Sequence, residues 1–210
     1  QNNVPRGTIT LKYLMIGTNV SQQTVQTSFE NETVLDPKKV LQYCGVKPGM
    51  NLADLGCGPN GYFAIPMAKM IGHGSKVYAI DIIKASLESL KSKADLMGLS
   101  NIITVWSNLE KVGAANVPRG TIDMCFIVNT LNQSNQHREI LIETASLLKP
   151  NGKIIIIDWD KNTGGGGPLN HQRVSKESIK KTTNELGIRV IKEFMASKFH
   201  FGLILDKIVS

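Results

Sequence analysis

Two patterns of hydrophobic positions alternate along the chain from about residue 36. Continuous apolar runs such as IDMCFIV (122–128) and KIIIIDW (153–159) are typical of central strands that are covered on both faces. Between such runs, apolar residues recur at helical spacing, as in SLESLKSKADLMGL (86–99). These patterns predict strands over residues 50–55, 76–81, 101–106, 122–128, 153–159, 188–194 and 199–207. They predict helices over residues 39–46, 62–71, 86–99, 136–149 and 175–187.

The alternation of predicted strands and helices indicates an α/β fold with a doubly wound sheet, helices on both faces and right-handed crossovers. Local signals support the boundaries, since Asp36 is a good N-cap and Pro37 suits the first helical turn. The run GGGG (164–167) predicts a mobile loop that is too short to separate two domains.

Composition narrows the class of protein. The chain has 210 residues, 41% of them hydrophobic and 20% charged, which suits one soluble globular domain. We expect a cytoplasmic protein, because no apolar run approaches the roughly 20 residues of a membrane span and no secretory leader is evident. Cys44, Cys57 and Cys125 have unrelated spacings, which predicts neither a disulfide framework nor a metal site. The net charge of +7 permits an anionic partner, nucleic acid included, but the lysines are scattered.

One short sequence, NVPRGTI, occurs twice, at residues 3–9 and 116–122. A weaker likeness continues beyond it, so we divide the chain into an N-terminal extension, 1–27, and a domain, 28–210. The extension holds a partial copy of residues 116–136.

The second copy is expected to be the functional one. The first copy has Thr10 and Ile16 at the positions that Asp123 and Asn129 occupy in the second. We expect residues 8–16 of the first copy to form an extra strand, or to compete with residues 122–128 for their position in the sheet. A homodimer that exchanges N-terminal segments is one consequence, and a duplication without any role is the alternative.

The sequence DLGCGPNG (54–61) follows the first predicted strand and has the spacing G-x-G-x-x-G at Gly56, Gly58 and Gly61. Glycines let a ligand approach the backbone closely, and the helix that follows offers free N–H groups. Asp81 ends the next strand, twenty residues after Gly61, where a carboxylate can accept both hydroxyls of a ribose. A nucleotide pocket at this edge of the sheet is therefore favoured over a plain tight turn.

Asp54 separates the two cofactors that such a turn can hold. A nicotinamide cofactor brings a pyrophosphate, which the Asp54 carboxylate would repel. S-adenosylmethionine has no phosphate and carries a sulfonium and an ammonium, which the carboxylate would attract. An NAD-dependent oxidoreductase stays as a disfavoured alternative.

The motifs together resemble the class I S-adenosylmethionine-dependent methyltransferases, in the small methyltransferase-domain branch related to the quinone-biosynthesis and arsenite methyltransferases. The resemblance runs from Phe29 to Lys207. It rests on the segments VKPGMNLADLGCGPNGYF, VYAID, ITVWSNLE, IDMCFIVNTLNQS and LLKPNGKIIIIDW. It implies a Rossmann-like fold whose mostly parallel seven-stranded sheet has an antiparallel last strand, methyltransferase activity, and S-adenosylmethionine as the cofactor.

The resemblance also implies roles for particular residues. The implied cofactor site is Asp54, Gly56, Gly58, Gly61, Asp81, Ile82, Asn108, Leu109 and Asn129. The family more often has aspartate where Asn108 stands, so weaker adenine binding is expected. The glycine turn is one residue longer than the common spacing, which affects the role of Gly61. Asn132 stands where relatives often have histidine, which excludes a histidine base there.

Catalysis of methyl transfer depends mainly on alignment, and a base is needed only when the acceptor must lose a proton. The candidates for catalysis are Asp158, at a strand end, and His200, within KFHFG. The candidates for acceptor binding are Trp159, His171 and Arg173. Each has a structural alternative, namely a turn cap, packing at the sheet rim, or a solvated loop.

The predicted function is methyl transfer from S-adenosylmethionine to a small-molecule acceptor. An RNA methyltransferase is an alternative, which would need lysines around the mouth of the pocket. A second alternative is a catalytically inactive S-adenosylmethionine-binding protein, which Asn108 and Asn132 leave open. Arsenic methylation is disfavoured because the three cysteines do not form a thiol relay.

Overall fold

The structure is a computed structural model, and it describes residues 32–164 and 166–207. The N-terminal extension and its copy of NVPRGTI therefore lie outside the described residues. None of the helices in the described part of the chain has the length and apolar character needed to span a bilayer.

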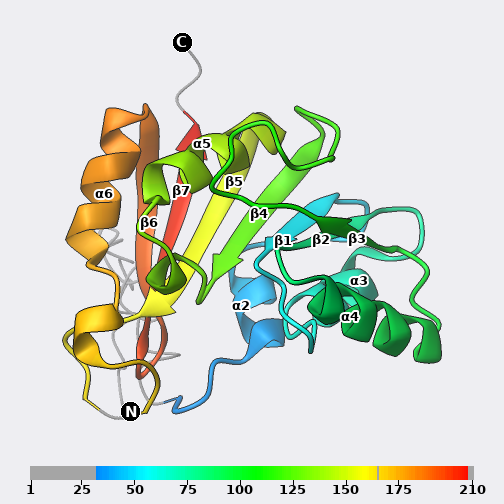
Figure 1. The fold of residues 1–210 in the computed structure, drawn as a ribbon, viewed down its shortest axis with the longest axis horizontal. Helices are drawn as coiled ribbons and strands as arrows, with labels where there is room; N and C mark the ends of the chain where they lie inside the picture. Colours follow the sequence, from blue (N-terminus) through cyan, green and yellow to red (C-terminus); the bar gives the residue numbers. More distant parts are fainter. Residues whose placement is uncertain (1–31, 165, 208–210) are drawn as a thin grey trace, which may run out of the picture.

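Seven strands of the described chain form one sheet with the order β3-β2-β1-β4-β5-β7-β6 (Figure 1). Their bounds are β1 Leu52–Leu55, β2 Val77–Asp81, β3 Ile102–Trp106, β4 Ile122–Val128, β5 Leu148–Trp159, β6 Ile188–Ser197 and β7 His200–Lys207. Neighbouring strands pair in parallel from β3 to β5, whereas β7 runs antiparallel to both β5 and β6. The predicted doubly wound, mostly parallel sheet with an antiparallel last strand is confirmed.

Helices cover both faces of the sheet (Figure 1). The α-helices of the described chain are α2 Pro37–Tyr43, α3 Ala64–Ile71, α4 Lys84–Leu96, α5 His137–Leu147 and α6 Lys176–Glu185. Two short 3₁₀ helices, η1 Leu131–Gln133 and η2 Asn170–Gln172, are additional to the predicted elements. Each 3₁₀ helix has only three residues and lies in a segment without helical periodicity, so the hydrophobic pattern does not predict it.

The sheet separates two hydrophobic cores. One core joins α2, α3 and α4 to the sheet, and the other joins α5 and α6 to it. Along β4, Met124 and Phe126 belong to the first core, whereas Cys125 and Ile127 belong to the second. This alternation explains why the strand reads as a continuous apolar run: both of its faces are buried.

β5 already begins at Leu148, whereas the sequence pattern placed its start at residue 153. Leu148 pairs with Ile122, and the register then shifts before Met124 pairs with Lys153. The shift lets the exposed segment around Pro150 bulge without ending the strand. The segment between the predicted helix, 136–149, and the predicted strand, 153–159, is therefore part of an irregular strand.

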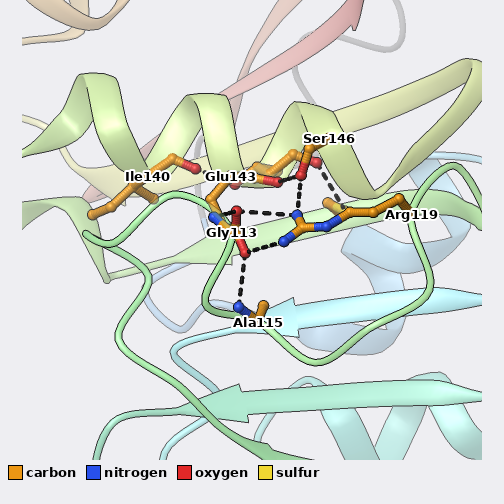
Figure 2. Close-up of polar contacts among 8 residues, drawn as sticks. Gly113, Ala115, Arg119, Ile140, Glu143 and Ser146 are labelled. Atoms are coloured by element: carbon orange, nitrogen blue, oxygen red, sulfur yellow. Dashed lines mark hydrogen bonds and ion pairs between the residues drawn. The ribbon is translucent and has the colours of Figure 1, made fainter.

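The loop between β3 and β4 is fastened to α5 by the buried side chain of Glu143 (Figure 2). Its carboxylate accepts hydrogen bonds from the backbone N–H groups of Gly113, at 2.7 Å, and Ala115, at 2.9 Å. The guanidinium of Arg119 donates to both carboxylate oxygens, at 3.0 and 3.1 Å. Burial alone would raise the pKa of Glu143, but these hydrogen bonds outweigh it and hold the pKa below its ordinary value.

Arg119 belongs to the second copy of NVPRGTI, so the structure gives this copy a clear role. Further along the same copy, Asp123 accepts a hydrogen bond from the backbone N–H of Asn51 and forms an ion pair with Lys149, each at 2.8 Å. These contacts fasten the start of β4 at the end of the sheet opposite to its carboxyl edge.

Replacing Glu143 with alanine should lower the free energy of unfolding by about 3 kcal/mol, because the change removes a buried, multiply bonded carboxylate and leaves its donors unpaired. Urea denaturation of the full chain measures the effect. The matched control is Glu88→Ala on the exposed face of α4, which should change stability little. Equal losses in the two variants would contradict the anchoring role of Glu143.

Candidate functional site

A cavity of about 450 Å³ opens at the carboxyl ends of β1 to β4. Among the predicted cofactor residues, its lining includes Gly56, Gly58, Asp81, Ile82, Asn108 and Leu109. The lining is completed by Pro59, Ile83, Ser86, Ser107, Glu110, Thr130, Gln133, Ser134 and Ile140. The sheet edge thus brings together residues that are far apart in the sequence, as the rule for doubly wound sheets predicts.

Asp81 is held in place by the backbone around it. One of its carboxylate oxygens accepts from the N–H of Gly58 and the other from the N–H of Ile83, both at 2.9 Å. The residue is buried, with 8% of its surface exposed. Because a carboxylate oxygen accepts more than one hydrogen bond, both oxygens retain capacity for the hydroxyls of a ribose.

The glycine turn uses its glycines in two different ways. Gly56 has a φ of 82°, and a Cβ at this position would collide with the side chain of Thr130, whose hydroxyl donates to the carbonyl of Leu55 at 2.9 Å. Gly61 has a φ of 57°, and a Cβ there would collide with Leu90 of α4. Gly56 therefore shapes the cavity wall, whereas Gly61 lets the turn pack against a helix.

Asp54 lies beneath the turn, with 2% of its surface exposed. Its Oδ2 atom has no hydrogen-bond partner within the described part of the chain. Burial raises the pKa of Asp54 to about 7, and the negative charge of Asp81 contributes to this rise. The hydrogen bond from the N–H of Ala64 acts in the opposite direction and lowers the pKa. A buried carboxylate with one oxygen unpaired is costly, and a cationic group on a ligand would compensate that oxygen.

The two asparagines of the predicted cofactor site differ in their surroundings. Asn108 lines the cavity, and its side-chain oxygen accepts from the N–H of Glu110 at 2.9 Å. Asn129 has a φ of 52° and lies outside the lining, and its buried Oδ1 has no partner among the described residues. The roles of Gly61 and Asn129 in cofactor binding stay predictions.

Sequence reasoning missed several residues that line the cavity. Ser134 donates to the Glu110 carboxylate at 2.6 Å, and Gln136 donates to it at 3.2 Å. This contact joins the loop after β3 to the segment after η1 and closes one side of the cavity. No motif marks these residues, because their proximity depends on how two separate loops pack.

A second cavity, of about 460 Å³, lies next to the first and shares Gln133 and Ser134 with it. Its lining is Leu131, Asn132, Gln133, Ser134, Asn135, His137, Lys161, His171, Gln172, Arg173, Val174, Ser175 and Ser178. Two predicted acceptor-site residues, His171 and Arg173, are among them. Trp159, Asp158 and His200 line neither cavity.

Asp158 is fully buried and supports the segment that separates the two cavities. The carboxylate of Asp158 accepts hydrogen bonds from the backbone N–H of Trp159, at 2.8 Å, and from that of Asn132, at 3.2 Å. Burial raises the pKa of Asp158 to about 6, although these hydrogen bonds act in the opposite direction. The geometry favours a turn-capping role over direct acid–base chemistry.

His200 is buried at the same edge of the sheet. Its Nδ1 is 2.8 Å from the hydroxyl of Ser197, and its ring centroid is 4.2 Å from that of Trp159. Burial lowers the pKa of His200 to about 4, and the charge of Arg173 lowers it further. A neutral, stacked imidazole of this kind packs Trp159 in place, and catalytic roles for His200 and Asp158 stay predictions.

Arg173 pins the glycine-rich loop after β5. Its guanidinium donates to the backbone carbonyls of Asp160, at 2.8 Å, Thr163, at 2.6 Å, and Gly166, at 2.9 Å, while Nε donates to that of Pro168. The guanidinium carbon is 5.5 Å from the Trp159 ring, against which Gly167 also packs. The loop is therefore fixed as one wall of the second cavity, and a direct contact of Arg173 with an acceptor stays a prediction.

The described residues contain no group of three or more histidine, cysteine, aspartate or glutamate side chains that could hold a metal ion. The three cysteines are all buried, and burial raises the pKa of each thiol.

Comparison with known proteins agrees with this geometry. The model of a family described as "Methyltransferase domain" matches residues 46–200. A solved SAM-dependent methyltransferase from Aquifex aeolicus is 30% identical, with a TM-score of 0.75, and the match covers 81% of this chain and 89% of that one. The fold, the glycine turn and the family match define a class I S-adenosylmethionine-dependent methyltransferase. The chain belongs to the methyltransferase domain family.

Curated relatives are more distant. The demethylmenaquinone methyltransferase of Bacillus mycoides is 25% identical over 126 residues, which are 60% of this chain and 52% of that protein. That of Lactococcus lactis is 26% identical over 125 residues, or 60% of this chain and 48% of the relative. The chain thus spans about half the length of the curated relatives that it matches.

Arg173→Lys should lower the free energy of unfolding by about 3 kcal/mol, because lysine keeps the charge but cannot reach several carbonyls in the geometry of a guanidinium. Limited proteolysis should also cut within the loop around residue 163 faster than in the wild type. Arg189→Lys, at an exposed pair with Asp206, is the control and should change neither property. An intact loop in Arg173→Lys would contradict the pinning role.

The Asp54 carboxyl should make cofactor affinity depend on pH. Its pKa is about 7 in the free chain, and a bound ammonium would favour the ionised form, so binding at lower pH releases a proton. Affinity for S-adenosylhomocysteine should rise by up to about tenfold per pH unit between about pH 5 and 7 and level off above. Calorimetry in buffers of different ionisation enthalpy counts the protons released.

The same shift has the opposite effect on the stability of the unliganded chain. The unfolded carboxyl ionises near its ordinary pKa of 3.8, below the folded value, so ionisation of Asp54 favours unfolding as the pH rises toward 7. Asp54→Asn should remove both pH dependences. A wild-type affinity that does not change with pH would contradict the proposed contact with the ammonium.

Proposed function

We propose that this methyltransferase transfers the methyl group of S-adenosylmethionine to a small-molecule acceptor held in the second cavity. The observation that carries the proposal is the juxtaposition of two cavities that share Gln133 and Ser134. The first is lined by the glycine turn and Asp81, with Asp54 buried beneath that turn, and the second is lined mainly by polar side chains.

The residues in and beneath the first cavity suit the cofactor group by group. Asp81 would hold the ribose hydroxyls, and Asn108 and Leu109 would contact the adenine. Asp54, which is buried beneath the glycine turn and outside the cavity lining, would attract the ammonium. The unpaired Oδ2 of Asp54 is the strongest sign of fit, because a ligand cation would compensate that buried acceptor. When bound, S-adenosylmethionine supplies a methyl group activated by a positively charged sulfur.

The chain's own residues would act mainly by position. Gln133 and Ser134 lie at the boundary of the two cavities, where they can orient an acceptor atom toward the first cavity. Asp158 supports this boundary from below through the N–H of Asn132.

The alternatives have less support. A pyrophosphate of NAD would approach the unpaired acid beneath the glycine turn, which disfavours an oxidoreductase. The second cavity has the volume of a small-molecule site rather than an extended nucleic-acid surface. The names of the curated relatives also point to a small acceptor. A cytoplasmic location and a dimer stay predictions.

Isothermal titration of S-adenosylmethionine, S-adenosylhomocysteine and NADH into the chain tests the cofactor assignment. We expect binding of the first two and none of NADH. Asp81→Ala should weaken binding by about a hundredfold, because hydrogen bonds to a charged acceptor contribute about 1.5–3 kcal/mol each. Asp81→Asn, which better preserves the shape of the turn, should also weaken it.

Asp95→Ala, at an exposed ion pair with Lys91 on α4, is the control and should bind like the wild type. Binding of NADH in place of S-adenosylmethionine would overturn the proposal. Binding without methyl transfer to any small-molecule acceptor pool would instead favour an inactive binding protein.

A further inference from the structure

The charged side chains that line the second cavity are all cationic, and the nearest carboxylates, those of Asp158 and Glu110, lie behind the lining, where they accept hydrogen bonds from Asn132 and Ser134. The residues that line it include the cations Lys161 and Arg173 and the imidazoles of His137 and His171, and no aspartate or glutamate. Only Leu131 and Val174 contribute larger apolar side chains. The lining therefore suits a polar ligand of negative charge.

The positions of these groups are fixed by different elements. Arg173 fastens the loop that carries Lys161, through its hydrogen bonds to the carbonyls of Asp160 and Thr163. His171 lies in η2, and four residues separate it from Lys176, the first residue of α6. His137 begins α5, and its Nε2 is 2.9 Å from the carbonyl of Leu131, so this nitrogen carries the proton and donates.

Uncharged donors complete the lining. Ser175 and Ser178 lie at the N-terminus of α6, where the helix dipole adds to the positive potential of the cavity. Asn132 and Gln133 add side-chain amides to the lining, and the Nε2 of Gln133 already donates to the carbonyl of Asn129 at 2.7 Å. An acceptor with a long hydrocarbon chain would instead place apolar surface against these polar groups without compensation.

We propose that the second cavity binds the methyl acceptor through an anionic group, a carboxylate or a phosphate, which Lys161 and His171 recognise. This inference rests on the proposed function, because it names the substrate class of the same site. The lysine and the histidine would fix one end of a small acceptor, and the end to be methylated would lie toward Gln133 and Ser134.

The test is calorimetric titration of inorganic phosphate and, separately, of malonate into the full chain, with and without saturating S-adenosylhomocysteine. We expect one of the two anions to bind at a single site. Binding of phosphate would indicate a phosphorylated acceptor, and binding of malonate would indicate an acceptor with a carboxylate. Lys161→Ala and His171→Ala should each weaken that binding by about fivefold or more, because each removes one of the few donors to the anion. Raising the salt concentration should weaken it as well.

The matched control is the double variant Lys91→Ala and His73→Ala. It removes one exposed lysine and one exposed histidine that do not line this cavity. It should leave anion binding unchanged. Absence of binding for both anions, or equal weakening in the control, would overturn the proposal. Tighter binding of a short single-stranded RNA or of a water-soluble neutral quinone than of either anion would overturn it too.

The outcomes separate this inference from the proposed function. Loss of S-adenosylhomocysteine binding would count against the cofactor assignment, whereas the anion titration without that ligand still decides the chemistry of the second cavity. Normal S-adenosylhomocysteine binding together with no anion binding would overturn the anionic acceptor alone.

Discussion

The carboxylate of Asp81 joins the end of β2 to the glycine turn that follows β1, and the cofactor site depends on this connection. Its two oxygens accept from the N–H groups of Gly58 and Ile83, so one side chain fixes the backbone of two adjacent loops. A turn rich in glycine would otherwise have many accessible conformations. The hydrogen bonds select one of them and also hold the acid where a ribose would lie.

Two arginine side chains fix the conformations of the loops beside the two cavities. Arg119 meets the buried carboxylate of Glu143 and fastens the loop that carries Asn108 and Glu110. The guanidinium of Arg173 donates to carbonyls of the loop after β5, among them those of Asp160, Thr163 and Gly166, and so orders one wall of the second cavity. The same planar donor group thus orders a loop beside each cavity.

The sequence predicted the elements that depend on local pattern. β4 has the predicted bounds, 122–128, because both of its faces are buried and turn residues limit it. Asp36 caps α2 as expected, since its carboxylate accepts from the N–H groups of Lys38 and Lys39. The glycine turn and Asp81 were also found, because their spacing reflects one connected strand–turn–helix unit.

The parts that were not predicted depend on contacts between distant loops. The 3₁₀ helix η1, the pairing of Ser134 with Glu110, and the clamp of Arg173 all depend on tertiary packing, which leaves no periodic pattern in the sequence. Asp158 and His200 are candidates for catalysis because they lie at the carboxyl edge of the sheet. Both are buried and neither lines a cavity, which are features that a position at a strand end does not reveal, and their catalytic roles stay predictions.

The division of the two cavities along the chain bears on how specificity can differ between relatives. The predicted cofactor residues that line the first cavity lie between Gly56 and Leu109, whereas the second cavity is built from residues 131–178. Substitutions in the second segment can therefore alter the acceptor without changing the contacts of the glycine turn. Under the proposed function the second cavity holds the acceptor, and its polar, cationic lining is then a better guide to the acceptor of this protein than the names of its relatives.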